Sequence, residues 1–213
     1  MNAIAGAQAA PAARAARRVL NVGGNSKRIP IPPHFAGWEH HLLDIDPAGA
    51  PDITCDAREL LGLPAAGYDA IYCSHNLEHY HRHDLPRVLA GFLHVLRPDG
   101  FADIRVPDMH AVFREMVSRG IDIDDPLYDS PAGPVSVNDV VYGFGRKIAE
   151  TGRDFYAHRN GFTLPSLVRA LRAAGFAPVF TSLPLFEVSA LAFRQEPTAE
   201  QRALLGLPPS RTT

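Results

Sequence analysis

The chain has 213 residues, of which 46% are hydrophobic, which is enough to build one substantial core. Its formal net charge of −2 gives no overall electrostatic attraction to nucleic acid or anionic lipid, so neither partner is expected. The sequence contains no run of about eighteen apolar residues that could span a membrane. Cys55 and Cys73 lie in or beside apolar strand-like runs, which indicates reduced core residues and a cytoplasmic location.

Both ends of the chain differ in composition from its centre. Residues 1–17 are rich in alanine and lack the basic start and continuous apolar stretch of a secretory signal, so we expect them to be disordered. Basic residues that include Arg17 and Arg18 form a solvated cluster there. Residues 196–213 are expected to be a tail, in which the segment 198–201 resembles the capping box of one short helix.

The first two predicted strands carry the strongest signal in the sequence. The run 19–25, Val-Leu-Asn-Val-Gly-Gly-Asn, predicts a strand that ends in two glycines, where a ligand can approach the backbone closely. About twenty residues later, the run 42–46 predicts a second strand that ends in an acid. A carboxylate at that tip can accept hydrogen bonds from both hydroxyls of a ribose. The pair therefore indicates a nucleoside cofactor site.

The remaining pattern alternates strands with helices, which predicts an α/β sheet. A loop is expected over 25–37, because Pro30, Pro32 and Pro33 are incompatible with the interior of a first helix. Further strands are expected near 52–55, 68–73, 101–106, 176–183 and 186–194. Helices are expected near 76–81, 84–96, 108–119, 137–151 and 164–174, and a turn at 97–100.

Several short segments resemble, in order, the class I S-adenosylmethionine-dependent methyltransferases, particularly the small type 11 methyltransferase domains. They are Leu20–Asn25, Leu43–Asp46, Asp56–Ala57, Tyr68–Ile71, Leu77–His79 and Val95–Gly100. The resemblance covers residues 18 to 194. It implies a Rossmann-like, mostly parallel sheet with an antiparallel last strand, helices on both faces and a shortened first helix. The cofactor that it implies is S-adenosyl-L-methionine.

The resemblance also implies roles for individual residues. The Gly23-Gly24 turn would pass under the methionine part of the cofactor, Asp44 would hold the ribose hydroxyls, and Asp56 would lie beside the adenine amino group. The tip of the fourth strand would lie closest to the transferable methyl group. The full set of expected cofactor-binding residues is Asn21, Gly23, Gly24, Asn25, Asp44, Ile45, Asp56, Ala57 and Ser74.

His75 and His158 are the candidate catalytic residues. The spacing of His75, Glu78 and His79 also fits the His-x-x-Glu-His pattern of one class of metallopeptidase, but the segment directly follows a predicted parallel strand, which disfavours that interpretation. Some methyltransferases with this fold hold a divalent ion on Glu and His residues at this place, which leaves Glu78, His79 and His75 as an alternative metal site. The favoured interpretation has no metal, with Glu78 and His79 lining the cofactor wall.

Residues 120–160 form the only long stretch outside the sheet pattern, and such segments in compact domains are usually functional. We expect them to cap the acceptor pocket, with His75 and His158 approaching it from opposite sides. Its aromatic residues are candidates for the pocket wall; they are Tyr142, Phe144, Phe155 and Tyr156. Asp46, which Pro47 follows, is expected to be only a turn residue.

These observations predict a methyltransferase domain over 18–195 that transfers methyl from S-adenosylmethionine to a small-molecule acceptor. The family resemblance favours O-methylation and implies a glycan or secondary-metabolite precursor as the acceptor. One alternative is a catalytically degenerate methyltransferase-like protein that binds a partner, because a Gly-Gly turn replaces the usual Gly-x-Gly. An NAD-dependent oxidoreductase is disfavoured, because no G-x-G-x-x-G motif is present. The sequence does not predict an oligomeric state.

Overall fold

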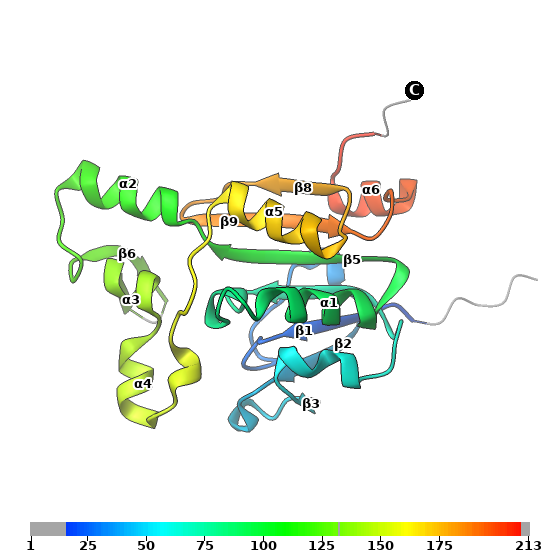
Figure 1. Cartoon of the computed structure of the whole chain (residues 1–213), viewed down its shortest axis with the longest axis horizontal. Coiled ribbons are helices and arrows are strands. Elements are labelled where there is room, and N and C mark those ends of the chain that lie inside the picture. The colour runs from blue at the N-terminus through cyan, green and yellow to red at the C-terminus, as the bar shows by residue number, and fades with distance from the viewer. Residues whose placement is uncertain (1–15, 132, 210–213) are drawn as a thin grey trace, which may run out of the picture.

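The computed structural model describes residues 16–131 and 133–209, and its centre is a seven-stranded sheet in the order β3-β2-β1-β4-β5-β9-β8 (Figure 1). Its strands are β1 (Arg18–Val22), β2 (Glu39–Asp44), β3 (Ile53–Thr54), β4 (Tyr68–Ser74), β5 (Leu96–Pro107), β8 (Val179–Ser182) and β9 (Glu187–Phe193). Strands β1 to β5 run parallel to one another, whereas β9 runs antiparallel to both of its neighbours, β5 and β8. This arrangement confirms the predicted mostly parallel sheet with an antiparallel strand.

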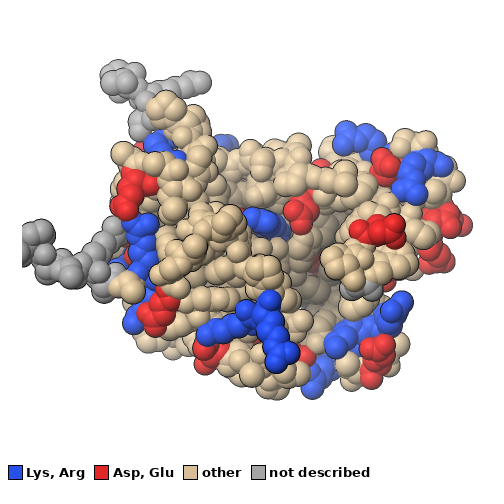
Figure 2. Space-filling view, turned by 180° about the vertical axis from the view of Figure 1, so that it is seen from behind, with Lys and Arg blue, Asp and Glu red and all other residues tan. Residues whose placement is uncertain are grey.

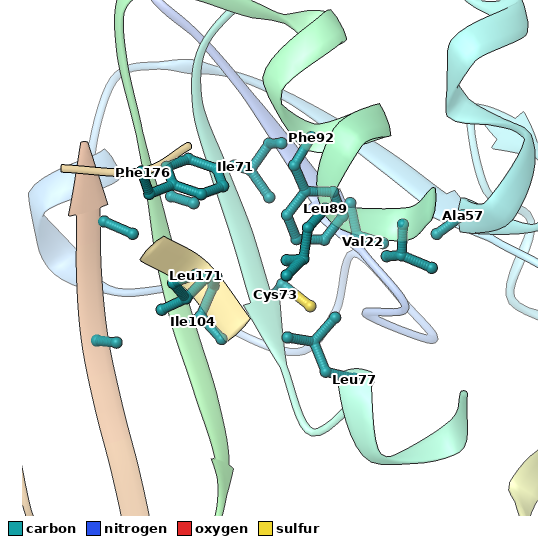
Figure 3. Close-up of a cluster of buried hydrophobic side chains, with 14 of the residues drawn as sticks. Val22, Ala57, Ile71, Cys73, Leu77, Leu89, Phe92, Ile104, Leu171 and Phe176 are labelled. Carbon is teal, nitrogen blue, oxygen red and sulfur yellow. The ribbon is translucent and has the colours of Figure 1, made fainter. Parts of the chain in front are cut away.

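One face of the sheet is covered by α1 (Leu85–Val95), α5 (Leu164–Ala174) and the 3₁₀ helix η3 (Ala57–Gly62). Leu89 and Phe92 of α1 lie near Ile71, and Leu171 of α5 lies near Ile104; all five are at most 1% exposed (Figure 3). Burial of each such side chain stabilises the fold by about 1.5–3 kcal/mol. The apolar residues of α1 face this core, and Gly175 ends α5 in a left-handed conformation.

The other face is covered by the proline-rich segment and by the C-terminal helix α6 (Ala199–Leu205). No α-helix follows β1, as predicted; only the 3₁₀ turn η1 (Pro33–Phe35) forms there, and Phe35 stacks on Phe101 at 6.1 Å between ring centroids. The predicted capping box of α6 is present at Thr198, and the side chain of Gln201 donates to the carbonyl of Asp99 at 2.7 Å. The tail therefore docks on the sheet.

Residues 109–160 form a separate layer, here called the cap, beyond the end of the sheet at which β5 stops (Figure 1). It contains α2 (Met109–Arg119), the hairpin β6 (Pro126–Ser130) and β7 (Gly133–Ser136), α3 (Val137–Tyr142), α4 (Gly145–Thr151) and the 3₁₀ turn η5 (Asp154–Tyr156). It has a small core of its own around Val112, Leu127, Val137 and Val140. Parallel strands present their carboxyl ends at this side, which is where open α/β sheets bind ligands.

Several predicted boundaries were wrong. Residues 97–100 are an irregularity within β5 and not a turn, because Leu96 pairs with Tyr68 and Phe101 with Ala70. The expected helix 137–151 is two helices, since Gly143 breaks it with a φ of 95°. A Cβ at that glycine would lie 2.3 Å from the carbonyl oxygen of Tyr156, so the packing of a distant segment sets the break.

Smaller corrections concern 3₁₀ elements and the N-terminal segment. The expected helix 76–81 is only the 3₁₀ turn η4 (Leu77–His79), and 3₁₀ turns η2 (Pro47–Gly49) and η3 were not predicted. The expectation of disorder over 1–17 falls mainly outside the described residues. Arg17 is described, and it pairs with Glu200 and lies over the ring of Trp38, contrary to that expectation. Within the described residues, no helix is long and apolar enough to cross a membrane.

Candidate active site at the strand tips

The turn after β1 has the open backbone that the sequence predicted. Gly23 has a φ of +73°, a region that favours glycine, and its N–H donates to the carbonyl of Leu43 at 2.8 Å. A Cβ at Gly23 would lie 2.0 Å from Nδ2 of Asn76. Glycine is thus required by the backbone conformation and by the side chain that packs on it.

Asp44 ends β2 directly beside this turn. Its carboxylate is 7% exposed and accepts two hydrogen bonds of 2.8 Å, from the backbone N–H groups of Asn25 and Asp46. Each carboxylate oxygen has a further lone pair, so Asp44 can still accept hydrogen bonds from hydroxyls. The next side chain, Ile45, is apolar and yet 43% exposed.

A cavity of about 380 Å³, here called the strand-tip pocket, opens between these residues and the cap. It is lined by Gly23, Asn25, Asp44, Ile45, Asp46, Asp56, Arg58, His75, Asn76, His79, Tyr80, Asp154, Phe155, Tyr156 and Arg159. Five of the nine predicted cofactor-binding residues are in this wall, together with His75. A hollow of about 400 Å³ between α1 and α5 has no acid or histidine in its wall, so we do not assign the site to it.

The other four predicted cofactor residues, Asn21, Gly24, Ala57 and Ser74, do not line the strand-tip pocket. Asn21 is buried, and its amide lies 3.2 Å from Nε2 of His40. A Cβ at Gly24 would lie 2.2 Å from that same amide, so Asn21 and Gly24 support the turn from below. Ala57 is 1% exposed under α1. Their positions follow from packing, which the residue spacing did not reveal.

Asp56 has a partner that the sequence analysis missed. It caps η3 through the N–H of Arg58 and also binds the guanidinium of Arg58 at 2.6 Å. Burial alone would raise the pKa of Asp56, but the hydrogen bonds from Arg58 lower it. Asp56 is therefore an anion whose partner also lines the pocket. The two residues are only two apart, so this pair could have been suspected from the sequence.

Asp46 ties the cap to the tip of β2, although it was expected to be only a turn residue. It accepts a hydrogen bond from the hydroxyl of Tyr156 at 2.6 Å and forms an ion pair with Arg153. The hydrogen bond from Tyr156 lowers the pKa of Asp46. Burial, together with this hydrogen bond, raises the pKa of Tyr156 to about 12. No signal in the sequence joins these residues, which lie more than a hundred positions apart.

A second cavity of about 310 Å³, here called the cap pocket, lies between the cap and the start of β9. It is lined by His75, Pro107, Tyr128, Asp129, Val135, Asp139, Val140, His158, Leu185, Phe186 and Glu187. Seen from behind, the molecule is hollowed between its larger body and the lobe that the cap forms (Figure 2). Both predicted catalytic histidines line this pocket.

The aromatic residues of the cap are placed differently from the prediction. Phe155 and Tyr156 line the strand-tip pocket and not the cap pocket. Tyr142 and Phe144 line neither pocket and are 58% and 47% exposed. The aromatic wall of the cap pocket is instead Tyr128 against Phe186, stacked at 5.7 Å between ring centroids.

His75 is the residue that both pockets share. It directly follows β4 and has a φ of +50°, an uncommon conformation for a residue with a side chain. Its Nε2 lies 2.5 Å from Oε1 of Glu187, and its Nδ1 lies 3.5 Å from Oε1 of Glu78. Burial opposes protonation, but these carboxylates outweigh it and raise the pKa of His75 to about 10.

His158 has a different environment from His75. Its Nδ1 lies 2.9 Å from the carbonyl oxygen of Val140, a hydrogen bond that locks the end of the cap. Burial lowers the pKa of His158, which keeps the imidazole neutral. Since Nδ1 must donate to the carbonyl, Nε2 carries a lone pair.

The strand-tip pocket suits the cofactor that the sequence resemblance implies. The left-handed backbone at Gly23 permits close approach, and the free lone pairs of Asp44 can accept ribose hydroxyls. Ile45 exposes the apolar surface that an adenine ring needs beside it. Arg159 also lines the pocket, where its guanidinium is paired with the carboxylate of Asp154 at 2.9 Å.

Solved structures with a similar fold include methyltransferases. A SAM-dependent methyltransferase from Archaeoglobus fulgidus is 16% identical, with a TM-score of 0.54 over 84% of this chain and 86% of that one. A Burkholderia thailandensis 1,6-didemethyltoxoflavin-N1-methyltransferase, with bound 1,6-didemethyltoxoflavin and S-adenosylhomocysteine, is 21% identical (TM-score 0.50, 85% and 72% covered). An O-methyltransferase family protein from Burkholderia thailandensis is 14% identical (TM-score 0.50, 84% and 51% covered). These identities show the fold alone.

The sequence itself gives the family. No match was found among curated proteins. The sequence model of the family described as "Methyltransferase domain" matches residues 4–180, which is most of the chain. This match removes the oxidoreductase alternative and gives S-adenosylmethionine as the cofactor. The chain belongs to the methyltransferase-domain family, and it is an enzyme of the class I S-adenosylmethionine-dependent type.

Proposed function

We propose that this methyltransferase transfers methyl to a hydroxyl oxygen of a small molecule held in the cap pocket. The observation that carries the proposal is the shared wall at His75: the strand-tip pocket lies on one side of it and the cap pocket on the other. A cofactor in the first pocket and an acceptor in the second would meet there. Such juxtaposition supplies much of the catalysis in a transfer between two bound molecules.

The two histidines suit different tasks in this arrangement. Both ring nitrogens of His75 face carboxylates, so it would act as a fixed hydrogen-bonding group of the wall and not as a base. His158 is neutral and offers the lone pair of Nε2 to the cap pocket, where it could take the proton of a hydroxyl. The bound S-adenosylmethionine supplies the electrophilic methyl on its sulfonium.

The lining of the cap pocket limits the class of acceptor. Tyr128 and Phe186 offer a stacked aromatic wall, which suits a ring or another flat apolar surface. Three carboxylates, Asp129, Asp139 and Glu187, outnumber the one protonated histidine of the wall, His75, which disfavours anionic acceptors. A neutral, hydroxylated molecule, such as a glycan or secondary-metabolite precursor, fits both features.

The test is direct. Calorimetry should show that S-adenosylhomocysteine binds and that NAD does not, and labelled S-adenosylmethionine should then transfer methyl to neutral polyols, phenols or glycosides. Mass spectrometry of the product would locate the methyl group. Transfer to amines or carbanions but not to hydroxyls would contradict O-methylation, and absence of S-adenosylhomocysteine binding would contradict the assigned cofactor pocket.

A further inference from the structure

Three side chains from two distant segments converge beneath the wall between the two pockets. The ligand atoms of Glu78, His79 and His158 all lie within 4.8 Å of one another. We propose that this cluster binds one divalent transition-metal ion. The site differs from the alternative that the sequence suggested, because His158 and not His75 completes it, and it would replace the expectation that the enzyme has no metal.

Glu78 is the first reason for the proposal. Its side chain is 2% exposed, and neither carboxylate oxygen accepts a hydrogen bond from residues 16–131 or 133–209. The neighbouring His75 lies 3.5 Å away, but its closer partner is Glu187 at 2.5 Å. The protonated His75 therefore compensates the charge of Glu78 only in part, and a buried carboxylate that no donor contacts costs several kcal/mol, so a cation in direct contact with it would stabilise the site.

The two histidines show which of their nitrogens are free. Nδ1 of His79 lies 3.1 Å from the carbonyl oxygen of Ala157, and Nδ1 of His158 lies 2.9 Å from that of Val140. Carbonyls only accept, so each Nδ1 carries the proton and each Nε2 keeps its lone pair. Histidines that bind metals are oriented in this way, through the opposite nitrogen. The cluster therefore offers two imidazole lone pairs, on Nε2 of His79 and of His158, and one carboxylate.

The backbone fixes this arrangement before any ion binds. The carbonyl of Glu78 accepts the N–H groups of Arg159 and Asn160, at 2.8 and 3.1 Å. With the bond from His79 to Ala157, these contacts join residues 78–79 to the end of the cap. The positions of the three side chains thus depend on paired backbone segments and not on flexible side chains alone.

The dimensions and the donor set indicate the kind of ion. Three atoms within 4.8 Å of one another share a centre at most about 2.8 Å from each, and a contraction of under 1 Å reaches zinc-like bond lengths of about 2.0–2.2 Å. Two imidazoles and one carboxylate favour Zn²⁺, Co²⁺, Fe²⁺ or Mn²⁺ over Mg²⁺ or Ca²⁺. Three protein ligands leave a position for water or an acceptor atom.

The location gives the ion a use, and this part of the inference rests on the proposed function. His79 lines the strand-tip pocket and His158 lines the cap pocket, so the cluster lies in their common boundary. An acceptor hydroxyl bound there would release its proton to water more readily. Its oxygen would then form the new bond to the methyl carbon while the bond from that carbon to sulfur breaks. With the ion bound, Nε2 of His158 would be a ligand, and the acidity of the ion-bound hydroxyl would take the place of the base assigned to His158 in the proposed function.

Metal binding can be measured without turnover. Chelator-treated protein should bind one Co²⁺ or Zn²⁺ per chain by calorimetry, and Co²⁺ should give visible absorption bands. The variants Glu78→Gln, His79→Asn and His158→Asn should each weaken binding by about 100-fold or more, because even indirect supporting partners of metal ligands contribute about 10–100-fold. Circular dichroism of each variant would establish that it is folded, and His158→Asn tests the site should Glu78→Gln fail to fold.

The matched control is the exposed, stacked pair His81 and His83, whose rings lie 5.4 Å apart outside both pockets. The double variant His81→Asn/His83→Asn should keep full metal affinity. Loss of binding in this control, retention of binding in the cluster variants, or no binding by the wild type would each overturn the proposal. If the protein bound S-adenosylhomocysteine but no metal, the metal site would be wrong and the proposed function would stand. If it bound metal but no S-adenosylhomocysteine, the metal site would stand and the proposed function would be wrong.

Discussion

The strand-tip half of the site and the cap half are built from contacts of very different range. At the strand tips, the carboxylate of Asp44 holds residues only two and nineteen positions away. In the cap, Arg153 and Tyr156 reach back to Asp46 across 107 and 110 positions. The first half is therefore specified by turns that the local sequence encodes, whereas the second exists only when the cap is docked.

This difference separates the two tasks of the enzyme. Changes at the strand tips should alter cofactor affinity, because the strand-tip pocket contains Gly23 and Asp44. Changes in the cap should alter the acceptor step, because the walls of the cap pocket come largely from residues 128–158 and the start of β9. The predictions below test whether that separation holds.

The largest effect is expected at the glycine turn. Gly23→Ala should lower the free energy of unfolding by about 3 kcal/mol, because alanine is strained at the left-handed backbone of this position and its Cβ would lie only 2.0 Å from the side chain of Asn76. Gly37→Ala is the matched control: Gly37 has nearly the same φ, +78°, but open space around it, so strain alone should cost about 1 kcal/mol. Urea unfolding measures both, and equal losses would show that the packing of Asn76 on the turn contributes nothing.

The cap half is tested at His158. His158→Ala should lower kcat by about 100-fold or more with any acceptor that supports turnover, because it removes the group that takes the hydroxyl proton or, with an ion bound, a ligand of the ion that acidifies that hydroxyl. Affinity for S-adenosylhomocysteine should stay nearly intact, because His158 does not line the strand-tip pocket. His81→Ala, outside both pockets, is the control for general effects of losing a histidine. A parallel fall in cofactor affinity would mean that the two halves are not separable.

Asp44→Ala tests the strand-tip half of the site and should weaken cofactor binding. We expect S-adenosylhomocysteine to bind more weakly by about 1–3 kcal/mol in calorimetry, because hydrogen bonds to a charged group are lost. The control is Asp52→Ala, since Asp52 also supports β2, through the N–H of Leu42 at 2.7 Å, but lies outside the strand-tip pocket. If a folded Asp44→Ala protein kept full affinity, Asp44 would no longer belong to the cofactor site.

The smallest effect is expected where the two halves meet. Asp46→Asn should destabilise the protein by about 1 kcal/mol at neutral pH, the net value of one hydrogen bond. The folded state lowers the pKa of Asp46 below its ordinary value of 3.8, so its stabilisation is present above pH 3.8 and is lost as the pH falls through the folded pKa. Melting curves of wild type and variant should therefore converge in acid. A constant difference at all pH values would show that the charge of Asp46 does not hold the cap.

Much of the frame could be predicted because its signals are local. The glycines after β1, the prolines that replace a first helix and the apolar stripe of α1 act through backbone geometry or side-chain spacing within a few residues. The capping box of α6 and the N-cap residue of α2, Asp108, are equally local signals. The position of Asp44 could also be predicted, because it is the last residue of a strand that the local sequence indicates.

Other features needed the tertiary structure. Gly143 divides a predicted helix because the chain near Tyr156 packs against it, and Asn21 was expected to touch the cofactor but supports the turn from below. The convergence of Glu78 with His158 and of Asp46 with Tyr156 requires closing loops of eighty residues or more. The sequence by itself determined which residues could end a strand, cap a helix or break one. Which of them meet was decided by packing, because the energy of such contacts appears only after the entropy of closing those long loops has been overcome.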